Sequence, residues 1–553
     1  MISDKAQKHF RRLNAPRENR AVVVHPAWDR VTDLIQENLS LQLQADYDFQ
    51  GRRLSVLCRQ ARRELLDAAR RWTAAYHDVG PTPGDSQDLI FLAGHQPQIF
   101  HPGVWLKNFA LGRLAEKHHA IAINLIVDSD AISATSLRVP GGSADNPTAA
   151  QVAFDRPDPA IPYEERRIED RALFDSFGQR VREQMAQLIP HPLMEEFWPL
   201  AILQSQETDR LGAGIARARH LIEAQWGLTT LEIPQSWVCD LDSFHWLAAH
   251  LLARMGEFSA VYNEAVREYR RLYRIRSASH PVPDLAVEGE WQEAPFWIWS
   301  QANPRRRRLF ARHSGHEVLI TDRQDINARL TLSRQRDASR AVEQLAELAR
   351  SGVKIRSRAL VTTLWARMVL GDLFIHGIGG GNYDLVTDRI MERFFGRQPP
   401  GFMILSATLH LPINQSPLPL GEGQGEGGAI TRDPSTIDRQ LRELTYHPER
   451  FLNGVFPQSQ DMPGKVRSLV KSKQKWIDGP QTIENTKTRC RAIRGINESL
   501  QPWLENPRRQ LLESREKAAK QEQAERILSW REYGFCLYPE ETLREFLDAL
   551  LPR

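Results

Sequence analysis

Two segments, far apart along the chain, alternate short apolar runs with a helical pattern, and this feature limits the possible folds most. In the first segment, Asp88–Ala93 and Ala120–Val127 are continuous apolar runs, as in buried parallel strands. Between them, Val104–His118 has the apolar spacing of a helix. Because two parallel strands need a crossover connection, this segment predicts a βαβ unit.

The second segment repeats the pattern. A strand is predicted over Asp372–His376, and a glycine-rich loop follows it. Asn382–Phe395 is predicted to be a helix with Asn382 as its N-cap, and Phe402–Ser406 returns as a strand. The two units together predict an α/β fold with a Rossmann-like parallel sheet and a C-terminal helical hairpin or coiled coil.

Local composition divides the rest of the chain. Its 553 residues exceed what a single hydrophobic core usually serves. Prolines and glycines break the first helical stretch near residue 80, and a low-complexity stretch later contains almost no large apolar groups. The expected parts are an N-terminal helical segment (1–80), the α/β core with helical insertions (81–412), a disordered insertion (413–434), a charged helical hairpin (435–530) and a tail packing on the core (531–553).

Charge and cysteine content exclude several classes of protein. The formal net charge of +4 predicts neither a nucleic-acid partner nor an anionic membrane partner. The four cysteines are scattered and show no metal-ligand or disulfide spacing. We find no apolar run of about 18 residues and no signal-like start, so a cytoplasmic protein is expected. The charged C-terminal helices could form a homodimer or pack only on their own chain.

The first loop, Gly94–Gly103, carries side chains suited to binding an anion. Ligands of open parallel sheets bind at the carboxyl ends of strands, and a helix N-terminus there offers free N–H groups. His95 and His101 can donate to an anion or exchange a proton near neutral pH, and Lys107 adds a cation. We expect these three side chains to be catalytic. Neighbouring residues expected to bind substrate or nucleotide are Gly94, Gln96 and Asn108.

Asp128 and Asp130 follow the next predicted strand, so they should reach the same rim of the sheet. There they could act in catalysis by binding a substrate amine, a ribose or Mg²⁺. A structural alternative stays open. In that interpretation His95 and Gln96 tie down a polar turn, and Asp128 caps a helix.

The second loop lies in the same strand-to-helix setting. Its glycines permit close backbone approach to a ligand, and successive N–H groups can form an anion-binding nest. It matches neither GxGxxG nor a Walker A loop, so a tight structural turn is the alternative. Arg356 and Arg358 could supply charge or form a surface pair. The residues expected to bind substrate or nucleotide are Arg358, His376, Gly377, Gly379, Gly380, Gly381, Asn382 and Asp384.

A few other segments carry weaker signals. The run Arg305–Arg308 lies close to Trp297 and Trp299 and could contact phosphates, although structural ion pairs are an alternative. Strands are also expected over Thr229–Ile233 and Glu317–Thr321.

The two loops together resemble one known family. Gly94-His95-Gln96-Pro97, then Pro102-Gly103 and Lys107, resembles the Gly-Gln-Gln-Pro…Gly-Pro…Lys segment of the bacillithiol-biosynthesis cysteine-adding enzymes. Asp128-Ser129-Asp130 stands where that family has a longer acidic segment. Arg358-Ala359-Leu360-Val361 and the stretch Ile375–Asp384 look like its Arg-Pro-Leu-Val segment and glycine-rich loop. His95 replaces a family glutamine.

This resemblance implies a Rossmann-like core with a coiled coil, and the ligation of cysteine to an amino sugar conjugate, with ATP or another nucleotide and Mg²⁺ as candidate cofactors. The residues support a broader hypothesis: a ligase or transferase that joins a small amine or thiol compound to an activated acyl or nucleotidyl partner. Two alternatives remain. One is a non-catalytic small-molecule-binding or scaffold protein that assembles through its helical hairpin, and the other is a sugar-nucleotide-type transferase.

Overall fold

A computed structural model describes residues 12–42, 46–79, 88–158, 161–335, 337–413, 434–458 and 460–551. The chain forms two compact units. Unit 1 comprises Met1–Gly141, Ala149–Pro412 and Trp530–Arg553, and unit 2 comprises Gly142–Thr148 and Ile413–Ser529. The low-complexity insertion predicted at 413–434 lies, apart from its two end residues, outside the described residues.

The predicted parallel sheet forms the centre of unit 1. Six strands lie in the order β1-β14-β13-β2-β3-β6, and only β1 runs antiparallel to its neighbour. The α/β fold with a Rossmann-like sheet is therefore confirmed. The strands are β1 (Val22–His25), β2 (Ile90–His95), β3 (Ile121–Ile126), β6 (Leu231–Pro234), β13 (Leu373–His376) and β14 (Met403–Ala407).

The strand order changes direction between β2 and β13. From β2 the chain continues outward to β3 and β6, and after β13 it continues to the other side, to β14. The segments that leave the carboxyl ends of β2 and β13 therefore diverge, which leaves a crevice between two neighbouring strands. The two sequence segments singled out above thus meet at this switch point.

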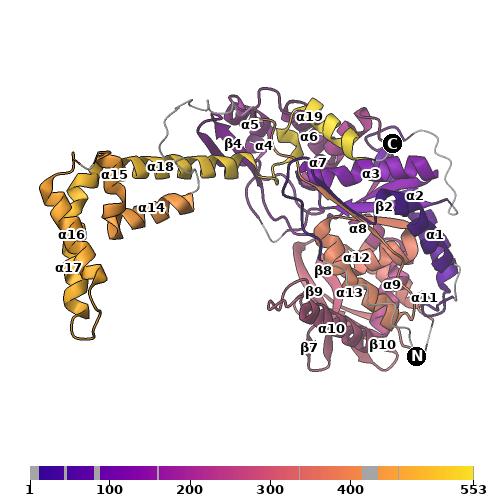
Figure 1. The fold of residues 1–553 in the computed structure, drawn as a ribbon. Coiled ribbons are helices and arrows are strands. Elements are labelled where there is room, and N and C mark those ends of the chain that lie inside the picture. The colour runs from indigo at the N-terminus through magenta and orange to yellow at the C-terminus, as the bar shows by residue number, and fades with distance from the viewer. Residues whose placement is uncertain are drawn as a thin grey trace. The chain divides into compact units, whose positions relative to one another are not determined.

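Helices cover both faces of this sheet (Figure 1). In that view α3 (Pro102–His118) and α7 (Leu211–Gln225) lie above it, and α9 (Asp242–Ala253) and α12 (Ala359–Trp365) lie below it. The continuous apolar strands need this double cover, because both of their faces are buried. The other helices of unit 1 are α1 (Val31–Gln42), α2 (Leu54–Ala74), α4 (Arg171–Asp175), α5 (Phe177–Met185), α6 (Met194–Thr208), α8 (Gln235–Cys239), α10 (Met255–Leu272), α11 (Ser339–Arg350), α13 (Ile378–Phe394) and α19 (Glu540–Leu550).

The glycine-rich segment after β13 is helical, which corrects one boundary. Helix α13 begins at Ile378 with Gly377 as its N-cap, so Asn382 is not the N-cap. Instead, the side chain of Asn382 exchanges two hydrogen bonds with the backbone of Leu13. Two of these glycines serve close packing, because a Cβ on Gly380 would lie 2.8 Å from His376 Nδ1 and one on Gly381 would collide with Ile404. A Cβ on Gly377 or Gly379 would meet no atom within 4 Å.

An antiparallel sheet is inserted between β6 and β13. Its order is β11-β10-β9-β8-β12, and the short strand β7 (Val287–Glu288) pairs with β8. The run Arg305–Arg308 lies within β9 and forms ion pairs, including Arg306 with Asp130. The strands are β8 (Trp291–Ser300), β9 (Asn303–Ser314), β10 (Glu317–Thr321), β11 (Asn327–Thr331) and β12 (Val353–Ser357); β4 (Ser136–Gly142) and β5 (Pro147–Ala153) form a separate pair.

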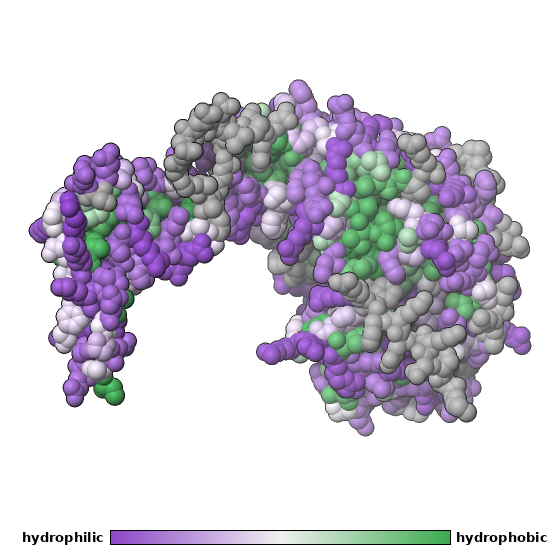
Figure 2. All heavy atoms as spheres, viewed as in Figure 1, coloured by the Kyte–Doolittle hydropathy of each residue, from purple (hydrophilic) through white to green (hydrophobic). Residues whose placement is uncertain are grey.

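The long segment of unit 2 is helical where the structure describes it, with a small core of its own. The face of these helices seen in Figure 2 is mainly hydrophilic. Helix α14 packs on α18, and α16 packs on α17. The chain stays helical from Thr486 to Leu528, and η5 carries Pro502. No helix in the described part of the chain is long and apolar enough to cross a membrane. The bounds are α14 (Pro434–Tyr446), α15 (Leu452–Val455), α16 (Gly464–Asp478), α17 (Thr486–Leu500), η5 (Gln501–Leu504) and α18 (Glu505–Leu528).

Gly103 offers a test of how α3 is seated on the sheet. A Cβ at this position would collide with the carbonyl oxygen of Ala407 in β14, whose backbone cannot move aside. We expect Gly103→Ala to lower the free energy of unfolding by about 3 kcal/mol, as overpacking of a close contact does. Gly256→Ala is the control, because its Cβ would meet only the flexible side chain of Gln292 at 3.4 Å. Urea unfolding measures both; equal stability of the two variants would contradict this packing.

Candidate functional site

A cavity of about 430 Å³ lies at the switch point. Its walls come mainly from the carboxyl ends of β2, β3, β13 and β14 and from the N-terminal parts of α3, α12 and α13. The two loops that the sequence singled out therefore share one cavity. The predicted site residues that line it are Gly94, His95, Gln96, His101, Lys107, Asp130, His376, Gly377, Gly379 and Gly380.

The two histidines of the first loop hold opposite tautomers. His95 Nδ1 lies 3.1 Å from the carbonyl oxygen of Gln96, which can only accept, so Nδ1 carries the proton and Nε2 keeps a lone pair. His101 is the N-cap of α3, and its Nδ1 accepts from the backbone N–H of Gly103 at 3.1 Å. Its Nε2 therefore carries the proton. One imidazole can accept a proton and the other can donate a hydrogen bond.

Both imidazoles are neutral at neutral pH. Burial, together with Lys107 nearby, lowers the pKa of His95 to about 3. Burial, Arg531 and Lys107 lower the pKa of His101 to about 3 as well. In the unliganded site these shifts oppose the proton exchange near neutral pH that the sequence led us to expect. A bound anion would oppose both causes by adding a negative charge, so it would raise these pKa values.

Lys107 places a buried cation beside the histidines. Its side chain is 2% exposed, and its Nζ donates to the carbonyl oxygen of Gly94 at 3.0 Å. Burial, with a smaller contribution from Arg219, lowers the pKa of Lys107 to about 8. Because no carboxylate pairs with this ammonium in the described residues, an anion in the cavity would find a charge that the fold leaves uncompensated.

The second loop adds donors from the helix end. The first N–H groups of α13 have no side-chain cap and line the cavity at Gly379 and Gly380. His376 ends β13, and its Nε2 lies 2.9 Å from Asp384 Oδ2, so this nitrogen donates. Burial lowers the pKa of His376 despite Asp384. Although burial alone would raise it, Arg367 and His376 hold the pKa of Asp384 below its usual range.

Acceptors gather on the other side of the cavity, at the ends of β3 and β6. Asp130 accepts from Gln96 Nε2 at 2.8 Å and pairs with Arg306 at 2.9 Å. Gln235, the residue after β6, lines the cavity as well. The cavity therefore has hydrogen-bond donors toward β13 and β14 and acceptors toward β3 and β6.

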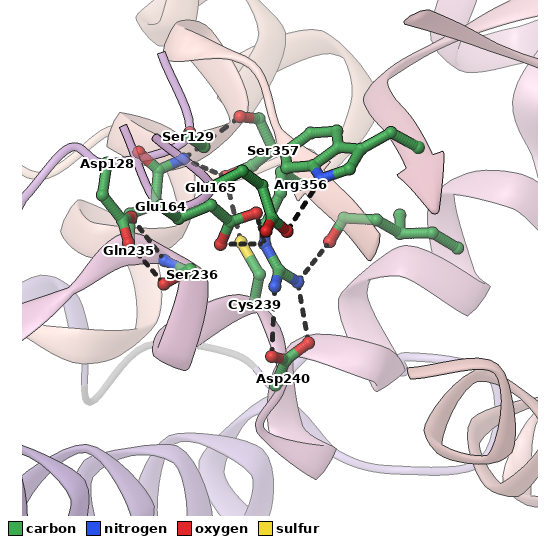
Figure 3. A network of polar contacts seen from close by, with 12 residues as sticks. Asp128, Ser129, Glu164, Glu165, Gln235, Ser236, Cys239, Asp240, Arg356 and Ser357 are labelled. Carbon is green, nitrogen blue, oxygen red and sulfur yellow. Dashed lines mark hydrogen bonds and ion pairs between the residues drawn. The ribbon is translucent and has the colours of Figure 1, made fainter. Parts of the chain in front are cut away.

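Asp128 does not line this cavity. Its carboxylate accepts from the backbone N–H and the hydroxyl of Ser236 at the start of α8, with the N–H at 2.9 Å, as the structural alternative supposed (Figure 3). Burial raises the pKa of Asp128 to about 6. Beside it, Arg356 binds Glu164 and Asp240 in the same buried network (Figure 3). Asp128 therefore supports the wall of the site from behind.

Other predicted residues also have structural partners and lie outside the cavity lining. Asn108 donates to Glu223 at 2.7 Å. Arg358 pairs with Glu293 at 2.6 Å and stacks on Trp297. The remaining three are Gly381, which packs on Ile404, Asn382, which holds Leu13, and Asp384, which orients His376.

Several lining residues were not predicted. Gln235 could have been found by the rule used for Asp128, since it also follows a predicted strand. Arg531 begins the tail that was expected to pack on the core, but no local pattern shows which side chain of that tail reaches the cavity. Its Nη2 lies 3.2 Å from the carbonyl oxygen of Ala407, and its guanidinium faces the donor side of the cavity. The others with polar side chains are Ser129, Ser357, Thr362, Thr363, Tyr383 and Ser406.

A resident metal ion finds little support here. Within the described ranges, no three His, Cys, Asp or Glu side chains cluster closely enough to hold one. The two aspartates considered for Mg²⁺ are engaged, Asp128 with Ser236 and Asp130 with Arg306. The donor set fits an anionic group better than a cation.

Lys107→Met tests whether the buried cation destabilises the fold. The folded-state pKa lies below that of a free lysine, so the protonated side chain costs about 3 kcal/mol below pH 8. We expect the variant to be more stable than the wild type at pH 7, and the difference should vanish as the pH rises from 8 toward 10.5. Lys117→Gln, on the exposed face of α3, is the control. Urea unfolding at several pH values provides the measurement; a destabilised variant at pH 7 would show that the ammonium contributes stability.

Comparison with models of protein families finds none that matches this chain, and comparison with curated proteins finds none with significant similarity.

Proposed function

We propose that the protein is a ligase or transferase that joins a small amine- or thiol-containing molecule to an anionic small-molecule partner in the switch-point cavity. The observation that carries this proposal is that His95, His101, Lys107 and the uncapped end of α13 line one cavity. A volume of about 430 Å³ is within the usual range for a small-molecule site.

The anionic partner binds on the donor side. Lys107 supplies charge, His101 Nε2 supplies an N–H, and the N–H groups at Gly379 and Gly380 complete the set. Because burial excludes water from Lys107, its attraction for an anion is stronger than at an exposed site. A carboxylate or a phosphate fits this chemistry.

The nucleophile binds toward the acceptor side. His95 Nε2, which keeps its lone pair, accepts the proton as an amine or thiol attacks the activated carbon or phosphorus atom. The leaving group departs as an anion, which His101 and Lys107 stabilise. The anionic partner itself favours this step, since its charge raises the pKa of His95.

The resemblance to the bacillithiol-biosynthesis cysteine-adding enzymes suggests the substrates and the use of a nucleotide. Cysteine is the proposed amine- and thiol-containing substrate, and an amino sugar conjugate is the molecule to which it is joined. If a nucleotide activates the acceptor, the residues that would hold its phosphates are Gly379, Gly380 and Lys107. A bound nucleotide would supply a good leaving group.

A scaffold function is the second candidate, and one observation favours it. Unit 2 exposes apolar side chains, among them Ile483 at 98% and Leu512 at 46%. Such side chains on a charged helical unit could contact a second copy of the chain. Light scattering across protein concentrations tests this, and a monomer at all concentrations would count against it.

His101→Asn tests the enzyme proposal without removing the helix cap. Asparagine can still accept from the Gly103 N–H but lacks the outward Nε2–H. We expect the melting temperature without ligand to change little. The variant should need about tenfold more sulfate than the wild type for the same rise in melting temperature. Thermal shift with sulfate, nucleotides, cysteine and amino sugars provides the measurement.

His119→Asn is the matched control, because His119 ends the same helix, is exposed and has a left-handed backbone that asparagine tolerates. If sulfate stabilises the wild type and His101→Asn equally, His101 does not contact the bound anion. If none of these ligands raises the melting temperature of the wild type, the proposed function is wrong.

A further inference from the structure

Gln235 carries an acceptor atom that the protein leaves without a partner. The residue is 3% exposed and lines the switch-point cavity from the end of β6. Its amide nitrogen donates to the carbonyl oxygen of Ser357 at 3.1 Å and lies 2.8 Å from both the Ser357 and Thr362 hydroxyls. Its Oε1 is buried and has no hydrogen-bond partner.

The orientation of this amide is determined by its neighbours. A backbone carbonyl can only accept, so the atom facing Ser357 O must be the nitrogen. Figure 3 shows Gln235 beside Ser357 in the polar network. The oxygen is therefore the free end, and a buried acceptor without a donor is unfavourable unless something completes it.

We propose that Gln235 determines specificity by accepting a hydrogen bond from the amine of the substrate. This inference rests on the proposed function. Asp130, which follows the neighbouring strand β3, also lines the cavity, and its two carboxylate oxygens already accept from Arg306 and Gln96. Both acceptors lie opposite the cationic side.

The strand order sets the length of the ligand. Gln235 follows β6, and Gly379 and Gly380 follow β13, three strands away. At the usual spacing between strands, β6 and β13 themselves are roughly 14 Å apart. The substrates together therefore extend across the sheet edge, with the anionic group over β13 and the amine over β6.

The test compares two probes that differ only in the amine, L-cysteine and 3-mercaptopropionate, each titrated calorimetrically into the full-length protein. We expect the wild type to bind cysteine at least tenfold more tightly, because the analogue leaves Oε1 unpaired. Gln235→Met removes the acceptor at similar size and should bring the ratio of affinities close to one.

Gln204→Met is the matched control. Gln204 is 7% exposed and also has an unpartnered buried Oε1, but it lies in α6 and does not line the cavity. Its substitution should leave the ratio unchanged. The ratio of the two affinities is the readout, because loss of the hydrogen bonds to Ser357 and Thr362 could weaken the binding of both probes equally. If Gln235→Met keeps the wild-type ratio, or if the wild type binds both probes equally, this inference is overturned while the proposed function stands. If the wild type binds neither probe, this inference is likewise overturned, whereas the proposed function is judged by the wider set of ligands in the thermal-shift measurement.

Discussion

The parallel pairing of β13 with β2 determines where the cavity of unit 1 lies, and a buried carboxylate stabilises this pairing. Asp372 Oδ2 accepts from the backbone N–H of Ile90 at 2.7 Å and from Arg62 at 2.8 Å, while its own N–H donates to Ile90 O. This interaction holds side by side two strands that are far apart in the sequence. Because the chain leaves them in opposite directions, the crevice between their carboxyl ends stays open.

The chemistry of the cavity follows from this arrangement. Helices α3 and α13 both start at the crevice, so their N-termini, Lys107 and His101 lie on one side of it. Residues after β3 and β6 lie on the other side and supply the acceptors Asp130 and Gln235. Donors on one side of the cavity and acceptors on the other suit one reactant that is anionic and one that donates hydrogen bonds. The buried network of Asp128, Ser236 and Arg356 supports the acceptor side without entering it.

The sequence predicted the parallel sheet and both loops because buried strands are continuous apolar runs that stand out without any tertiary information. It could not separate Asp128 from Asp130. Both follow β3, but which carboxylate turns to Ser236 depends on α8, over a hundred residues away. It also misplaced the start of α13, since glycines that pack closely on His376 and Ile404 look like a loop in sequence. Arg531 could not be predicted as a lining residue for a related reason, because only the folded chain brings its side chain to Ala407.

The central claim is that the switch-point cavity is an anion site, and locating a bound anion tests it most directly. A crystal of the full-length protein soaked in selenate, measured at the selenium absorption edge, would show where a tetrahedral anion binds. If the cavity is an anion site, we expect an anomalous peak between Lys107 Nζ, His101 Nε2 and the backbone of Gly380. Peaks elsewhere on the protein, with none in this cavity, would contradict it.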